Sequence, residues 1–141
     1  MYTSKESHYS ISKNAAFMGV GRNNVRYIKA DSEGRMMSSE LEKQIIKDKA
    51  AGLNPFCINA TASTTVMGAF DPIKEISKIA KAHKIWLHVD GAFGGSVIFS
   101  KKHKHLLNGL ENADSFSLNA HKMLGTPLST SIVIVQNKKH L

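Results

Sequence analysis

A short apolar run that ends in a carboxylate, followed by glycines, constrains the fold of this chain more than any other stretch. Residues 85–89, Ile-Trp-Leu-His-Val, are rich in β-branched and aromatic side chains, as is typical of a strand buried on both faces. Asp90 follows directly, and Gly91, Gly94 and Gly95 allow the backbone to turn sharply or to approach a bound group. In an open α/β sheet, ligands bind at the carboxyl ends of the strands. Asp90 is therefore a candidate site residue; the alternative is an aspartate that caps the following turn.

The composition is that of a soluble globular protein. With 141 residues, the chain is long enough for one domain with a hydrophobic core. It has no apolar span of membrane-crossing length, and its first residues lack the apolar region of a signal peptide, so we expect a cytoplasmic protein with no membrane partner. Cys57 is the single cysteine, which excludes an internal disulfide and indicates a small core residue rather than a reactive thiol.

The formal net charge of +8 raises the question of nucleic acid binding. The lysines are interleaved with acidic residues, and the only compact basic cluster is Lys-Lys-His-Lys-His at residues 101–105. This cluster matches no nucleic-acid-binding motif, and a solvated helix face explains it better than a phosphate-backbone site. His103 and His105 diverge on a helix and make a poor metal pair. We therefore expect no nucleic acid partner and no metal site, and keep a basic nucleic acid binder as a distant alternative.

Strand patterns and helix patterns alternate along the chain. The patterns predict strands over residues 25–28, 55–58, 85–90, 115–118 and 131–135. They predict helices over residues 9–18, from 39 to a C-cap glycine at Gly52, from 71 up to the strand at 85, and over 101–110. Ser39 and Glu42 form a capping box, and Asp71 with Pro72 suits an N-cap and the first helical position. This alternation predicts an α/β fold in one domain, with a mostly parallel sheet and helices on both faces.

Three loops of this predicted sheet start at its carboxyl edge, after Asn59, at Asp90 and after Asn119. The loop after residue 119 carries His121 and Lys122, and the loop at residues 7–10 can reach the same edge if its helix packs alongside. The first of these loops is rich in hydroxyl groups, namely Thr61, Ser63, Thr64 and Thr65. Such convergence of polar groups is the expected layout of a binding site.

A lysine and an aspartate that rise from neighbouring strands suit one cofactor in particular. A lysine amine can form an imine with an aldehyde, and a carboxylate can hold a proton on a nearby nitrogen. Together they describe pyridoxal phosphate, with Lys122 forming the Schiff base and Asp90 paired with the pyridinium nitrogen. The alternative for Lys122 is an ordinary exposed lysine in a basic protein.

Several segments then resemble the group II pyridoxal-phosphate-dependent amino acid decarboxylases, and most closely the glutamate and cysteine sulfinate decarboxylases. These segments are residues 8–10, 59–61 with 64–65, 68–72, 86–90 and 119–123. The resemblance implies the large domain of the aspartate aminotransferase-like fold, a homodimer, and pyridoxal phosphate as cofactor. The implied reaction is α-decarboxylation of an acidic amino acid, with cysteine sulfinate, glutamate or aspartate as the substrate. Residues 94–97 and 105–109 look closer to the cysteine sulfinate branch.

The resemblance also implies roles for individual residues. His8 resembles the imidazole that stacks on the cofactor ring, and Ala92 the small residue against the ring face. Thr61 and Thr65 resemble hydroxyl groups near the ring oxygen. Asp90 resembles the partner of the ring nitrogen, His121 the histidine near the phosphate, and Lys122 the Schiff-base lysine. His8, Asp90 and Lys122 are thus the expected catalytic residues.

The chain also departs from the family pattern. Members usually have proline in place of Ala120, and often alanine and tryptophan in place of Gly91 and Phe93. We expect Ala120 to loosen the turn that aims Lys122, and Gly91 to do the same for Asp90. Family members are also longer, with an upstream phosphate loop, a downstream loop that carries a catalytic tyrosine, and a C-terminal small domain. We therefore expect residues 1–141 to form a partial cofactor-binding large domain; the alternative is a catalytically inactive fragment that acts as an interaction module.

Overall fold

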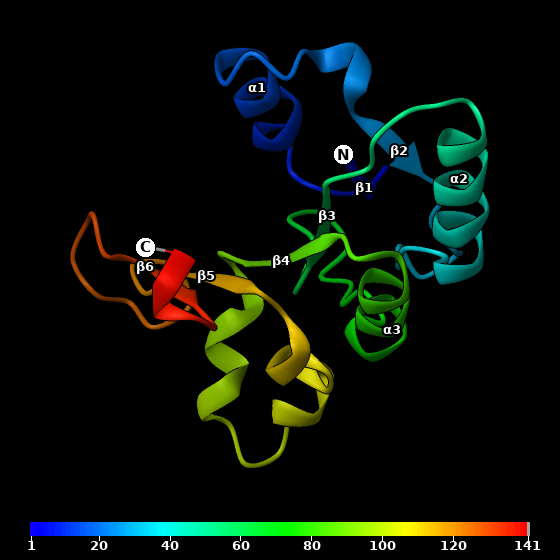
Figure 1. Ribbon diagram of the computed structural model, residues 1–141. Coiled ribbons are helices and arrows are strands. Elements are labelled where there is room, and N and C mark those ends of the chain that lie inside the picture. The colour runs from blue at the N-terminus through cyan, green and yellow to red at the C-terminus, as the bar shows by residue number, and fades with distance from the viewer. Residues whose placement is uncertain (141) are drawn as a thin grey trace.

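The computed structural model describes residues 1–140 and is built around a six-stranded sheet (Figure 1). Its strands lie in the order β2-β1-β3-β4-β5-β6, and all neighbours are parallel except β5 and β6. The strands are β1 (Tyr2–Ser4), β2 (Arg26–Ile28), β3 (Cys57–Thr61), β4 (Trp86–Gly91), β5 (Ser115–Asn119) and β6 (Ser131–Val135). The predicted α/β fold with a mostly parallel sheet is therefore confirmed.

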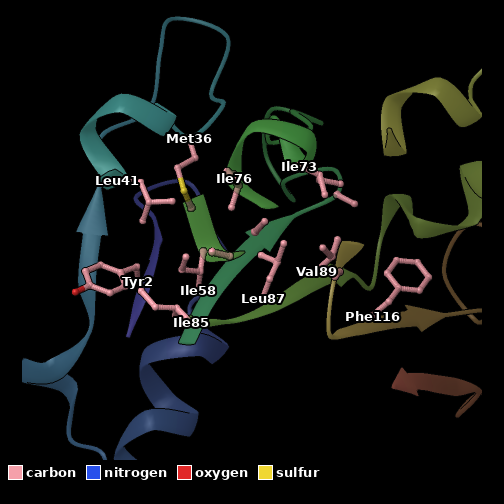
Figure 2. Close-up of a cluster of buried hydrophobic side chains, with 14 of the residues drawn as sticks. Tyr2, Met36, Leu41, Ile58, Ile73, Ile76, Ile85, Leu87, Val89 and Phe116 are labelled. Carbon is pink, nitrogen blue, oxygen red and sulfur yellow. The ribbon is translucent and has the colours of Figure 1, made fainter. Parts of the chain in front are cut away.

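Helices lie on both sides of this sheet. The α-helices are α1 (Ser10–Phe17), α2 (Ser38–Ala50) and α3 (Ile73–His83). Helices α2 and α3 cover one face, and α1 lies on the opposite side (Figures 1 and 2). Short 3₁₀ turns complete the chain at Arg22–Asn24, Gly94–Phe99, Lys104–Leu107, Leu110–Asn112 and Lys138–His140. Within residues 1–140, no helix has the length and apolar character needed to span a membrane.

The hydrophobic core fills the space between the sheet and helices α2 and α3, as Figure 2 shows. Alternate residues of the central strands point into it, and the two helices contribute residues at helical spacing. Burying each of these large apolar side chains contributes about 1.5–3 kcal/mol. The fully buried members include Ile58, Leu87 and Val89 from the strands and Leu41, Ile45 and Ile76 from the helices.

The opposite face of the sheet is polar. In β4, Trp86, His88 and Asp90 are half-buried and alternate with the buried Leu87 and Val89. The prediction of a strand buried on both faces was therefore wrong. The side chains of this strand alternate between the core and the polar face. The alternation was not recognised in the sequence because Trp86 is apolar but lies on the same face as the polar residues.

Two predicted helix caps are also wrong. Helix α2 begins at Ser38, and no side chain among the described residues caps it, so the capping box of Ser39 does not form. Helix α3 has Pro72 as its N-cap residue. The carboxylate of Asp71 instead accepts the backbone N–H of Met36 at 2.6 Å and that of Thr61 at 2.7 Å. These buried donors need a partner, and Asp71 supplies it. The predicted C-cap glycine does follow α2, with φ of +76° at Gly52.

The helix expected over residues 101–110 is not formed, and short 3₁₀ turns at Lys104–Leu107 and Leu110–Asn112 lie on either side of Gly109. Gly109 has φ of +97°, and its backbone lies so close to α3 that an added Cβ would meet the backbone nitrogen of Lys74 at 2.5 Å. A continuous helix cannot satisfy both conditions.

Candidate functional site

A cavity of about 310 Å³ lies at the carboxyl ends of β3, β4 and β5, where α1 approaches the polar face of the sheet. The predicted site residues that line it come from segments far apart in the sequence and are His8, Thr61, Thr65, Asp90, Ala92 and Lys122. The structure thus brings together all the predicted residues except His121. Their individual roles stay predictions.

His121 lies in the loop between β5 and β6 and does not line the cavity. Its Nδ1 accepts the backbone N–H of Thr130 at 3.1 Å. This hydrogen bond closes the loop that follows Lys122. Its contact with a cofactor phosphate stays a prediction.

Asp90 combines the two interpretations that its sequence position allows. Its Oδ1 accepts the backbone N–H of Ala92 at 3.0 Å, so the carboxylate does cap the turn after β4. The same oxygen accepts the hydroxyl of Ser117, from the neighbouring strand, at 3.4 Å. Since Asp90 also lines the cavity, the cap fixes the orientation of a carboxylate that a ligand can reach.

Lys122 lies in the turn after β5, with an exposed side chain at the cavity. Ala120, two residues before Lys122, is buried, and its N–H donates to the carbonyl of Thr130 at 2.9 Å. A proline in place of Ala120 has no N–H to donate. Ala120 therefore forms a hydrogen bond between the two ends of the loop that a proline could not form, and the expected loosening of the turn stays a prediction.

Gly91 does not leave free space beside Asp90. An added Cβ would clash with the ring of Phe116, and it would lie 2.8 Å from the carbonyl oxygen of Ser117 and 2.9 Å from the Cα of Gly95. The ring of Phe116 thus occupies the volume that an alanine methyl group would take. The expectation that Gly91 loosens Asp90 stays a prediction, but the space beside Gly91 is filled.

The cavity also contains polar residues that the sequence reasoning did not identify. His88 and Ser117 reach it from β4 and β5, and burial lowers the pKa of His88. The signal for His88 was its position two residues before Asp90, which puts both side chains on one face of a strand. Ser117 is opposite Asp90 in the register of β4 and β5, and this pairing cannot be read from one sequence. The remaining unpredicted polar lining residues are Ser10, Asn14 and Asn119.

His8 lies between β1 and α1, where its Nδ1 is 2.8 Å from the hydroxyl of Ser10. Across the cavity, the hydroxyl oxygen of Thr61 is buried and has no hydrogen-bond partner within residues 1–140. The carboxylate of Asp71 accepts the backbone N–H of Thr61. Burial raises the pKa of Asp71 to about 6. The end of β3 therefore has a buried hydroxyl without a partner among the described residues, on a backbone that Asp71 fixes.

The chain matches the family described as the pyridoxal-dependent decarboxylase conserved domain over residues 1–141. It is 48% identical over 141 residues to cysteine sulfinic acid decarboxylase of Mus musculus, a match that covers 100% of this chain and 29% of that protein. It is 45% identical over 141 residues to acidic amino acid decarboxylase GADL1 of Mus musculus, covering 100% of this chain and 26% of that relative.

The fold agrees with these matches. The crystal structure of mouse CSAD superposes with a TM-score of 0.96 at 49% identity, over 97% of this chain and 29% of that one. The aspartate aminotransferase-like fold is therefore confirmed. The family match over the whole chain, the sequence identity and the superposition agree, and the chain belongs to the pyridoxal-dependent decarboxylases.

Proposed function

We propose that these residues form part of the active site of a pyridoxal-phosphate-dependent decarboxylase that acts on an acidic amino acid. The observation that carries the proposal is the cavity that gathers the amine of Lys122, the carboxylate of Asp90 and the imidazole of His8. The chain spans 29% of the cysteine sulfinic acid decarboxylase that it matches. The proposal therefore concerns the portion of the active site that residues 1–141 supply.

The groups that line the cavity fit pyridoxal phosphate. The buried hydroxyl of Thr61 has no partner in the described part of the chain, so it is free to bond a polar ring substituent. Both hydrogen bonds that the described residues give to the Asp90 side chain go to Oδ1, which leaves Oδ2 for a ligand. A pyridine ring with a basic nitrogen, a hydroxyl and an aldehyde matches the acid, the hydroxyl and the amine of this cavity.

When bound, pyridoxal phosphate acts as an electron sink for the bonds at the α-carbon of an amino acid. Lys122 supplies the amine that joins the cofactor aldehyde, and Asp90 holds a proton on the ring nitrogen. His8 and Ala92 set the two faces of the ring. Thr61 and Thr65 offer hydroxyl groups to its oxygen. Carbon dioxide is the product that leaves the substrate.

The substrate that we propose is cysteine sulfinate, with glutamate and aspartate as the other acidic candidates. Two observations support an acidic substrate. The relatives at 48% and 45% identity are a cysteine sulfinic acid decarboxylase and an acidic amino acid decarboxylase. The Gly94–Val97 segment, which resembles the cysteine sulfinate branch, begins directly after Phe93, a cavity residue.

The test is a chimera in which residues 1–141 replace the matching segment of the mouse cysteine sulfinic acid decarboxylase. We expect the chimera to bind pyridoxal phosphate and to release carbon dioxide from cysteine sulfinate. Lys122→Ala should abolish the borohydride-reducible cofactor adduct, whereas Lys101→Ala, outside the cavity, should keep it. Asp90→Asn should keep the fold and weak cofactor binding and reduce turnover severely.

Two results would contradict the proposal. One is a borohydride-reducible adduct that survives Lys122→Ala. The other is a chimera that holds the cofactor but releases no carbon dioxide from any acidic amino acid. If the chimera does not fold, the 141-residue chain itself is treated with pyridoxal phosphate and borohydride. Peptide mapping should then show Lys122 modified in preference to the other exposed lysines.

The alternative function, a catalytically inactive interaction module, is favoured by the sheet edge. Strand β6 has exposed apolar side chains at Ile132, Val133 and Ile134, and an exposed apolar edge strand invites pairing with another chain. A folded chimera without cofactor or turnover would support this alternative.

A further inference from the structure

A row of side chains on the polar face of β4 and β5 leads from the surface to Asp90. Trp86 Nε1 donates to the hydroxyl of Ser115 at 2.9 Å, and that hydroxyl is 2.8 Å from His88 Nδ1. On the other side of the imidazole, His88 Nε2 is 3.4 Å from the hydroxyl of Ser117, which is 3.4 Å from Asp90 Oδ1. The row therefore joins Trp86 to the proposed cofactor site through His88.

The two ends of this row fix the direction of its hydrogen bonds. An indole N–H can only donate, and an ionised carboxylate can only accept. Ser115 accepts from Trp86 and uses its own proton toward His88 Nδ1. His88 then carries its proton on Nε2 and donates it to Ser117, whose hydroxyl donates to Asp90. In this arrangement every donor has an acceptor, and hydrogen bonds aligned in one direction reinforce one another.

The imidazole must be neutral to take its place in this row, because only a neutral imidazole both donates and accepts. Burial of His88 lowers its pKa and so favours the neutral form. A protonated His88 would donate from both nitrogens, and Ser115 would then receive two donors while its own proton lost its acceptor. The half-buried setting of His88 thus agrees with the direction that Trp86 and Asp90 impose.

We propose that His88 is a positioning residue that, through Ser117, directs a hydrogen bond onto Asp90 Oδ1 and so keeps Oδ2 turned toward the cofactor nitrogen. This inference rests on the proposed function, because the role of Asp90 does. In this role His88 acts through Ser117 and Asp90 and not on the reacting atoms. Its contribution is to carry its proton on Nε2, from which it donates a hydrogen bond to Ser117.

The first test is the tautomer of His88 in the 141-residue chain without cofactor. Histidine ring ¹⁵N NMR should show a protonated Nε2 and an unprotonated Nδ1 for His88, assigned by the loss of its signals in His88→Phe. A proton on Nδ1 would overturn the inference. Because no cofactor is present, this result does not depend on the proposed function.

The second test uses matched variants in the chimera. Ser117→Ala should weaken cofactor binding and lower kcat by roughly 10-fold to 100-fold, as expected for loss of a hydrogen bond to a charged group. Ser117→Thr, which keeps the hydroxyl, and His88→Gln, which keeps a donor near the Nε2 position, should retain most of both. KM for the substrate should change little in all three variants.

The outcomes separate the two proposals. If the unmodified chimera binds no cofactor, the proposed function fails, and the tautomer measurement still decides the direction of the row. If the chimera is active and Ser117→Ala matches Ser117→Thr in cofactor affinity and kcat, the positioning role of His88 is wrong while the proposed function stands.

Discussion

Asp71 accepts the N–H groups of Met36 and Thr61 and leaves the start of α3 to Pro72. Asp71 is 2% exposed, and burial raises the pKa of its carboxyl group to about 6. In the unfolded chain an aspartate titrates near 3.9, so the folded protein binds the extra proton between these two values. The contribution of Asp71 to stability is therefore fully present below about pH 4 and is lost as the pH rises through 6.

This linkage predicts a pH dependence that one substitution removes. The unfolding free energy of the wild type, minus that of Asp71→Asn, should fall as the pH rises from 4 to 6. A single group gives a slope of at most about 1.4 kcal/mol per pH unit. Urea unfolding of both proteins at matched pH values measures the difference, in which the other titrating groups cancel. A difference that grows with pH would show that Asp71 titrates below its unfolded value.

Ser63 adopts φ of +72°, in the left-handed region that favours glycine, and it lines the cavity. Ser63→Gly should therefore raise the unfolding free energy by about 1 kcal/mol, because it removes the strain of a side chain in that region. The control is Ser39→Gly, in the first turn of α2, where added backbone freedom should lower stability. Thermal or urea unfolding compares the two, and a loss of stability in Ser63→Gly would contradict the prediction.

Between elements, the close approach of β4 and β5 depends on Gly91 and Phe116. Strand β5 brings the Phe116 ring into the space beside Gly91, while the carbonyl of Ser117 and the Cα of Gly95 close the remaining sides. Many family members have alanine in place of Gly91. In this chain the Phe116 ring, from the neighbouring strand β5, fills the space of that methyl group.

We expect Gly91→Ala to lower the unfolding free energy by about 1–3 kcal/mol, as is usual when a methyl group is forced into a packed core. Phe116→Val should make room for part of that methyl group. The double variant should therefore lose less stability than the sum of the two single variants, although the backbone contacts at residues 95 and 117 prevent full recovery. A double-mutant cycle by urea unfolding measures this coupling, and additive losses would show that the ring is not the obstacle.

The sequence predicted those elements whose pattern is local. The apolar spacing of Ile73, Ile76 and Ala80 predicted α3, and the runs before Thr61 and Asp90 predicted the central strands. Strand β1 was missed because its three residues, Tyr2–Ser4, are too few to show an alternation. The cap at Asp71 was wrong because a carboxylate can bond distant backbone groups as well as local ones. The cap at Ser39 was wrong because α2 begins one residue earlier, at Ser38.

The site was predictable where a residue follows a strand, and less so where it depends on pairing between strands. Asp90 ends an apolar run, and Lys122 lies in the turn after the alternating strand at residues 115–118, so their meeting at one edge follows from a parallel sheet. The contact of Ser117 with Asp90 depends on the register of β4 and β5, which no local pattern encodes. His88 was missed because it lies inside a run that was interpreted as buried.

As a whole, the chain presents the acid and the amine of the proposed site, but the cavity lining contains no glycine within the described residues. Tight binding of a phosphate group relies on oriented backbone N–H groups, commonly from a glycine-rich loop or a helix N-terminus. The matching relative is also longer, since the chain covers 29% of it. Lys122 is exposed to solvent, and we expect residues 1–141 to supply only part of the contacts to a phosphate group.

We expect the isolated 141-residue chain to bind pyridoxal phosphate weakly and to show no turnover. An open site does not exclude water from the reacting groups, and catalysis of this kind depends on such exclusion. The measurement is carbon dioxide release from cysteine sulfinate, glutamate and aspartate after addition of cofactor. A rate on the order of 1 s⁻¹ or more, typical of an enzyme, would show that these residues suffice for catalysis.

The alternation of side chains along β4 determines both which residues pack in the core and which line the cavity. Leu87 and Val89 belong to the core, and His88 and Asp90 belong to the cavity, only because consecutive side chains point to opposite faces. Single substitutions can alter either set without disturbing the other. Inserting one residue between His88 and Val89 would reverse the faces of the residues that follow, moving the carboxylate of Asp90 into the core and the side chain of Val89 into the cavity. A change in the length of this strand is therefore more disruptive than a substitution within it.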